Sequence, residues 1–152
     1  NMFGKPRSWT DELLWHQACH MVDFIYWLFD EPDIEAWAQA GPTHPGLGIP
    51  MDITIGMRSK TGCLVSSANS FNNHGSITSN YRFIGEEATF LIEKGKLIDH
   101  DGNEVSVGAG GLDVQDREFL DAIKNGRTPM TSCKTCLPTM AILDRLQGII
   151  GD

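Results

Sequence analysis

The first strongly patterned stretch runs from Trp9 to Phe29, and its hydrophobic period is that of a helix. Apolar residues surround the predicted helix on almost every side, and one stripe of ionisable residues interrupts them. His16, His20 and Asp23 form this stripe, since positions i, i+4 and i+7 of an α-helix fall within roughly 60° of arc. We expect so apolar a helix to be buried, and buried ionisable groups are costly unless they are paired or used. The pattern therefore predicts that the stripe carries function.

After this helix the hydrophobic period changes to two, which is typical of half-buried strands. The alternation predicts strands over 34–40, 51–58, 62–71, 77–83 and 88–93. Short turns are expected at 60–62, 85–87 and 101–103, and the segment 41–50, rich in Pro and Gly, predicts a shaped loop.

Helices are expected near 113–125 and 132–149, and Pro138 predicts a kink or an irregular first turn in the second of them. Ser8 followed by Asp11 is a capping-box pattern for the first helix. The order is helix, five to seven strands, then two helices. It indicates an α+β fold with a largely antiparallel open sheet and helices packed on one sheet face. The other face carries Trp37, so we expect it to serve as an interface.

Composition narrows the class of protein. The 152 residues predict a single domain over 1–152, and the first residues read like the middle of a longer protein. A net charge of −8 argues against nucleic-acid binding, and no apolar run is long enough for a membrane span. The four cysteines lack the spacing of a disulfide framework, which favours reduced thiols and a cytoplasmic location. We expect Cys133-x-x-Cys136 to be structural, because one such pair without further ligands is a weak metal signal.

No phosphate-binding motif is visible. GxGxxG does not follow any predicted strand, and Gly108–Gly111 lacks the strand–turn–helix context of a phosphate cradle. We therefore expect no cofactor-binding residue and no metal ligand in this chain.

Residues 7–29, RSWTDELLWHQACHMVDFIYWLF, resemble the helix that opens the C-terminal domain of Gfo/Idh/MocA-type oxidoreductases. His20 falls on the family's histidine, Asp23 on the aspartate that follows it, and Trp27-Leu28 on the end of the pattern. His16 departs from the family, where an aspartate is usual.

Three further stretches resemble one branch of this family: GPTHPGLGIPMDITIG (41–56), SFNNHG (70–75) and VQDREFLDAIKNGRTP (114–129). The branch oxidises a dicarboxylate semialdehyde, in its cyclic hemiacetal form, to 2-pyrone-4,6-dicarboxylate. The resemblance implies a two-domain enzyme whose N-terminal Rossmann domain binds NADP or NAD and supplies a lysine. This chain would be the substrate-binding and oligomerisation domain, inactive without that partner, and a homo-oligomer through its sheet face.

Roles for the stripe follow from this chemistry. Oxidation of a hydroxyl-bearing carbon needs a proton acceptor, and histidine suits the task because its ordinary pKa is near 6.5. His20 is the candidate acceptor. His16 would bond the same oxygen or fix the ring of His20, and Asp23 would orient a neighbour at the substrate site rather than react.

A dicarboxylate substrate also needs hydrogen-bond donors. Arg7 and Ser8 before the helix, and His44 in the shaped loop, are candidates. Asn72 and Asn73 are further candidates, although the sequence FNNHG could equally form a plain turn. For Arg7 the alternative is an ordinary solvated charge.

Other functions stay open at this point. The chain could belong to a sugar or polyol dehydrogenase of the same family, or be a non-catalytic dimerisation module. Two histidines at i and i+4 could also share a metal in a hydrolase, but Gln17 stands where an HExxH site has its glutamate base.

Overall fold

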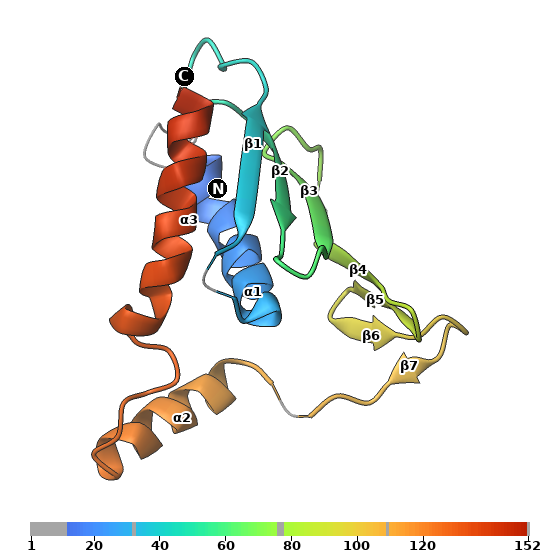
Figure 1. The fold of residues 1–152 in the computed structure, drawn as a ribbon, viewed down its shortest axis with the longest axis vertical. Helices are drawn as coiled ribbons and strands as arrows, with labels where there is room; N and C mark the ends of the chain where they lie inside the picture. The colour runs from blue at the N-terminus through green and yellow to red at the C-terminus, as the bar shows by residue number, and fades with distance from the viewer. Residues whose placement is uncertain (1–11, 32, 76–77, 109, 152) are drawn as a thin grey trace. The chain divides into compact units, whose positions relative to one another are not determined.

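The computed structural model describes residues 12–31, 33–75, 78–108 and 110–151 (Figure 1). The chain groups into two compact units, Asn1–Asn72 with Thr131–Asp152, and Asn73–Met130. The first unit contains η2 (Leu14–Ala18), α1 (Cys19–Phe29), β1 (Glu35–Ala40), β2 (Asp52–Arg58), β3 (Leu64–Ser70) and α3 (Cys133–Gly151). The second contains β4 (Asn80–Ile84), β5 (Thr89–Glu93), β6 (Lys96–Ile98), β7 (Glu104–Val105) and α2 (Leu112–Lys124).

The α+β class is confirmed, but the described strands form two antiparallel sheets, β1-β2-β3 and β4-β5-β6-β7, rather than the one that the pattern predicts. The break lies between β3 and β4. There the side chain of Asn73 donates to the carbonyl of Gly75, and Gly75 has a positive φ of 81°. A locally bonded turn of this kind ends the strand pairing, because its backbone groups no longer align with a neighbouring strand.

Helices α1 and α3 cover one face of the β1-β2-β3 sheet (Figure 1). The register places Ala38 of β1 beside Ile55 of β2, so alternate residues of both strands share one face. The buried side chains of this layer come from both helices and the sheet: Leu13, Leu14, Val22, Ile25, Ile34, Ile53, Ile55, Met57, Ile142, Leu143 and Leu146. The core of the first unit is therefore a helix layer on a sheet, as the sequence pattern predicts.

The prediction that the first helix is buried almost all round is wrong. One side of it lies in the core, whereas His16, His20 and Asp23 are exposed and Trp27 is 71% exposed. The helix also begins with a π-helical turn, Leu14–Ala18, before it continues as α1. Residues 9–11 and the proposed capping box lie outside the described residues. The helix ends at Phe29, because Asp30 adopts a left-handed conformation with φ 48°.

The other face of the β1-β2-β3 sheet has no described helix over it. Trp37 stands opposite Gly56, and a Cβ on Gly56 would lie 2.2 Å from the indole Nε1 of Trp37. The ring therefore lies flat over the glycine, which has no side chain to displace it. Trp37 is 53% exposed and Leu64 on β3 is 74% exposed, so this open face is partly apolar.

In the second unit, β5 and β6 are joined by a two-residue turn in which Lys94 and Gly95 both have positive φ values, 52° and 77°. This geometry is that of a hairpin turn. β6 and β7 are too short to show alternation in the sequence. α2 ends at Lys124, followed by Asn125-Gly126 as predicted.

α3 runs from Cys133 to Gly151 and continues through Pro138. In the described part of the chain, no helix combines the length and the apolar character that a bilayer crossing requires.

Candidate functional site

The π-helical turn sets the direction of His16. A π turn takes more residues per revolution than an α turn, and such turns are frequent at functional sites. The ring of His16 packs edge-on against Phe71, with 6.3 Å between ring centroids and 63° between ring planes. Phe71 directly follows β3, so this contact joins the first helix to the end of the sheet. His16 thus faces the β3 side of the first unit.

His20 lies one turn further along, in α1, and it is exposed. Among the described residues, no side chain forms a hydrogen bond or ion pair with its imidazole. A proton acceptor must reach its substrate, so exposure of the ring meets the first requirement of the role predicted for His20.

Asp23 points to the other side, towards α3. The hydroxyl of Thr139 donates to Asp23 Oδ1 over 2.6 Å, and Thr139 itself is 1% exposed. About two turns earlier in the same helix, the indole N–H of Trp15 donates to the side-chain oxygen of Gln147 over 2.9 Å. Two side-chain hydrogen bonds therefore join the first helix to α3. The structure therefore divides the predicted stripe: His16 contacts the end of β3, and Asp23 bonds α3. Part of the reason is the π turn, which the α-helical estimate of the arc does not include.

Asn72 belongs to a small polar network around Asp52. Its side-chain amide donates to Asp52 Oδ2 over 2.7 Å, and its backbone N–H donates to the hydroxyl of Ser70 over 2.9 Å. Ser70 in turn donates to Asp52 Oδ1 over 2.6 Å. Asn73 bonds only the nearby Gly75 carbonyl among the described residues, which is the turn role weighed for it above.

His44, in the shaped loop 41–50, accepts a hydrogen bond at one of its two ring nitrogens. The backbone N–H of Gly46 donates to His44 Nδ1 over 3.1 Å, so Nδ1 is the acceptor. In a neutral imidazole the proton must then be on Nε2, which makes this atom a hydrogen-bond donor. The loop is closed by a backbone bond from the N–H of His44 to the carbonyl of Ile49 and by the bridge between Thr43 and Pro50.

Arg7 and Ser8 lie outside the described residues, so their predicted contacts with substrate stay predictions.

Cys19 lies in the helix that carries the candidate stripe, between His16 and His20. Burial raises the pKa of the Cys19 thiol, and the charge of Asp23 adds to the rise, so this thiol stays protonated and unreactive near neutral pH. All four cysteines are free. Nowhere in the described ranges do three or more His, Cys, Asp or Glu side chains gather in a way that could hold a metal ion.

Sequence reasoning did not single out Thr139 or Asp52. Thr139 could have been found, since it starts the buried stripe Thr139, Ile142, Leu143 and Leu146, at i, i+3, i+4 and i+7. A hydroxyl in an apolar stripe predicts a buried partner. No comparable signal marks Asp52, which reads as one polar residue of an alternating strand.

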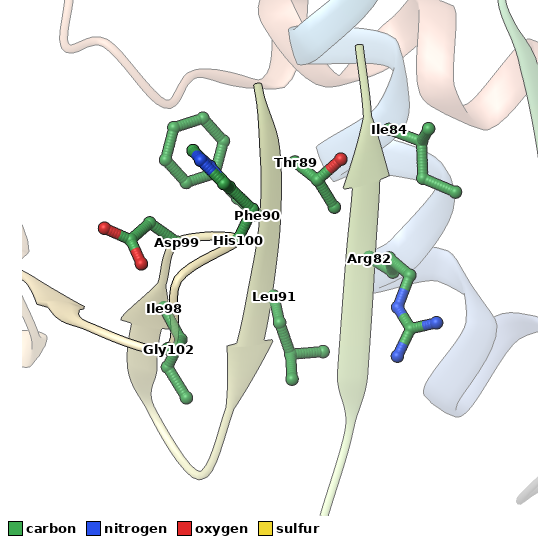
Figure 2. Close-up of a pocket in the computed structure, with 9 residues that line it drawn as sticks. All are labelled: Arg82, Ile84, Thr89, Phe90, Leu91, Ile98, Asp99, His100 and Gly102. Carbon is green, nitrogen blue, oxygen red and sulfur yellow. The ribbon is translucent and has the colours of Figure 1, made fainter. Parts of the chain in front are cut away.

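The second unit has a surface hollow of about 420 Å³, shown in Figure 2, on the sheet formed by β4, β5 and β6. Leu91 and Ile98 provide apolar lining, and the side chains of Arg82 and His100 lie at its edges. His100 pairs with Asp101 over 3.6 Å. None of the residues predicted for the site lines this hollow.

A second hollow, of about 390 Å³, lies in the first unit. It opens between Glu12, the end of β1 and the C-terminal end of α3, next to Thr43 and Pro50 of the shaped loop. Glu12 stands four residues before His16, so this hollow borders the start of the helix that carries the candidate stripe.

Comparison with known proteins places this geometry in a family. Residues 1–111 match the model of bacterial oxidoreductase C-terminal domains. The chain is 39% identical to 4-carboxy-2-hydroxymuconate-6-semialdehyde dehydrogenase of Sphingobium sp. (strain NBRC 103272 / SYK-6), over 97% of this chain and 48% of the relative.

Solved structures agree on the fold. UDP-N-acetylglucosamine 3-dehydrogenase from Acidithiobacillus ferrooxidans superposes with a TM-score of 0.79 at 16% identity, covering 96% of this chain and 49% of that one. Scyllo-inositol dehydrogenase from Lactobacillus casei, solved with NAD(H) and scyllo-inositol, gives a TM-score of 0.68 at 14% identity, covering 92% and 46%. The chain thus spans about half the length of the relatives it matches. It belongs to the family of bacterial oxidoreductase C-terminal domains.

Proposed function

We propose that this chain is the substrate-binding half of an NAD(P)-dependent dehydrogenase that oxidises the cyclic hemiacetal of 4-carboxy-2-hydroxymuconate-6-semialdehyde to 2-pyrone-4,6-dicarboxylate. The observation that carries the proposal is the pair of exposed imidazoles on one helix, His16 and His20, beside a π-helical turn. The 39% identity with the Sphingobium dehydrogenase over nearly the whole chain supports the choice of substrate.

In the proposed reaction His20 accepts the proton of the substrate hydroxyl while the carbon–oxygen double bond forms. An imidazole suits this step because its ordinary pKa lies close to neutral pH, so the neutral base and its protonated form are both accessible. His16 lies one turn before His20 and would donate to, or accept from, the same oxygen. Its ring is held by packing on Phe71, which fixes the direction of the imidazole.

The nicotinamide ring would accept the hydride from the same carbon, and its dinucleotide would be bound outside this chain. The described residues do not fit such a cofactor. Gly110 and Gly111 precede α2, but they do not directly follow a strand, so no strand–turn–helix cradle forms there. The dinucleotide, NADP or NAD, is therefore assigned to an N-terminal Rossmann domain.

The substrate carboxylates need donors, and His44 supplies one through Nε2. Arg7 and Ser8 precede the helix that carries His16, and we assign them to the carboxylates as well. Asn72 would line the same side of the site as His16, because Asn72 directly follows Phe71. The substrate contact of Asn73 stays a prediction.

The sheet face with Trp37 and Leu64 is proposed as the homo-oligomer interface. Exposed aromatic and aliphatic side chains on a sheet face are typical of surfaces that become buried on association. Four free cysteines fit a reducing compartment, so we assign the enzyme to the cytoplasm.

The test uses the two-domain protein with the hemiacetal substrate, and follows reduction of NADP or NAD by absorbance. We expect His20→Ala to lower kcat by about 10²–10⁴-fold, the usual contribution of a general base. Gln17→Ala is the matched control, because Gln17 is an exposed neighbour on the same helix. Unchanged turnover in His20→Ala would remove the assigned proton acceptor. Turnover of a sugar or polyol in place of the hemiacetal would move the enzyme to another branch of the family.

A further inference from the structure

Asp52 connects three segments that the sequence analysis treats separately. Its backbone carbonyl accepts the N–H of Gly41, where the shaped loop begins, over 2.8 Å. Its carboxylate accepts the hydroxyl of Ser70 over 2.6 Å and the side-chain amide of Asn72 over 2.7 Å. Asp52, the first residue of β2, therefore bonds the loop that carries His44, the end of β3 and the segment that follows β3.

The bonds around Asp52 form a relay. The backbone N–H of Asn72 donates to Ser70 Oγ over 2.9 Å, and Ser70 Oγ–H donates to Asp52 Oδ1. Hydrogen bonds to an ionised carboxylate are about twice as strong as neutral ones, and linked bonds polarise one another. The relay fixes both the side chain and the backbone of Asn72.

The residue between the two partners is Phe71, whose ring packs against His16. Its backbone N–H donates to the carbonyl of Met51, the residue before Asp52, over 2.8 Å. Fixing Ser70 and Asn72 on either side therefore also fixes the ring on which His16 rests. Since His20 forms no hydrogen bond with this network among the described residues, the effect is specific to the His16 side of the site.

We propose that Asp52 is a positioning residue, which holds the segment Ser70–Asn72 against His16 and so shapes the proposed substrate-binding site on that side. The inference rests on the proposed function, because it assigns the His16 side of the proposed site to substrate. A residue of this kind acts on substrate binding and leaves the proton-accepting step at His20 intact.

The experiment measures KM and kcat of the two-domain enzyme with the hemiacetal substrate. We expect Asp52→Ala to raise KM about tenfold, the effect of losing one or two such bonds, while kcat stays within about twofold. Asp52→Asn keeps an acceptor oxygen for one of the two donors, so its KM should rise less than that of Asp52→Ala. Ser70→Ala, which breaks only the relay, should raise KM less than Asp52→Ala.

Asp33→Ala is the matched control. Asp33 also has an exposed carboxylate with one short bond, 2.7 Å to the ammonium of Lys60, but it lies before β1 and away from Ser70–Asn72. We expect its KM to equal that of the unmodified enzyme. A KM unchanged in Asp52→Ala, or a loss confined to kcat, overturns the proposal.

A second measurement separates this proposal from the proposed function. Amide hydrogen exchange of residues 70–72 is expected to be faster in Asp52→Ala than in Asp33→Ala. The backbone N–H of Asn72 donates to Ser70 Oγ, and in Asp52→Ala this hydroxyl is no longer held by the Asp52 carboxylate. If the unmodified enzyme turns over no hemiacetal, the proposed function fails, and exchange alone decides whether Asp52 holds the segment. Equal exchange in the two variants overturns that hold.

Discussion

The two units of this chain differ in how they bury their apolar side chains. In the first unit, α1 and α3 cover a three-stranded sheet, and Leu14, Ile55 and Leu143 are 0% exposed. In the second unit, Ala122 is the one buried residue among those described, and Phe119, Leu120 and Ile123 on α2 are more than half exposed. The candidate residues His16, His20, Asp23, His44 and Asn72 lie in the unit with the packed layer, and Asn73 is the first residue of the other unit. A rigid layer holds side chains in fixed directions, which a site requires.

The largest expected contrast between the units is in core packing. Leu143→Ala removes a fully buried side chain from α3, so we expect it to lower the free energy of unfolding by about 2–5 kcal/mol. Leu120→Ala on α2 removes a side chain that is 63% exposed, and we expect a change within about 0.5 kcal/mol. Urea denaturation of both variants measures the difference. Equal losses would mean that the second unit has a core of comparable importance.

A smaller contrast is expected at two glycines. Gly56→Ala places a methyl group where the Trp37 ring lies, so the ring must move, and we expect a loss of about 1–3 kcal/mol. Gly108→Ala in the second unit meets no atom within 4 Å and should be close to neutral. Denaturation midpoints, together with a changed tryptophan emission in the first variant alone, check this prediction. A neutral Gly56→Ala would show that the indole does not depend on the glycine.

The smallest expected contrast between the two units is in how their stability changes at acidic pH. Lys60 holds the pKa of Asp33 below its ordinary range in the first unit, mainly through a side-chain hydrogen bond, and Arg127 does the same for Glu118 in the second. A carboxyl whose pKa is depressed in the folded state stabilises the fold above its unfolded pKa and loses this contribution as pH falls through the folded value.

Both units should therefore lose stability below about pH 4, near the ordinary carboxyl pKa. Glu118 accepts from both Arg127 and the backbone N–H of Met130, so Glu118→Gln should flatten the acid response more than Asp33→Asn. The difference between the unfolding midpoints at pH 6 and pH 3, compared between the two variants, measures the acid response. Since Asp33 is exposed and Glu118 is still partly exposed, the effect should be small, and an equal response of the two variants would contradict the comparison.

The period of hydrophobic residues predicted most of the elements. The strands at 34–40, 51–58 and 88–93 and the ends of α2 agree with the structure within about two residues, because alternation and a terminal Asn-Gly are local properties. β6 and β7 were not located, since strands of three and two residues have no measurable period. The division into two sheets was not predicted either, because alternation within a strand does not show whether two consecutive strands, here β3 and β4, pair with each other.

For the candidate site, sequence located His16, His20 and Asp23 on one helix but not their surroundings. A π turn leaves no hydrophobic signature, so the separate directions of His16 and Asp23 could not be predicted. The contact of His16 with Phe71 joins residues 55 positions apart along the chain, and Thr139 meets Asp23 across 116 positions. Such contacts follow from packing and not from spacing.

The sequence alone determined the α+β class, the helix that presents two histidines, the absence of a dinucleotide motif and the family resemblance. These properties are encoded in short-range periods and residue order. Tertiary structure decided that the histidine face is exposed, that Asp23 is engaged by a buried threonine and that Asp52 bonds three segments at once. Burial and hydrogen-bond partners depend on which surfaces meet in space, and no local pattern of residues specifies that.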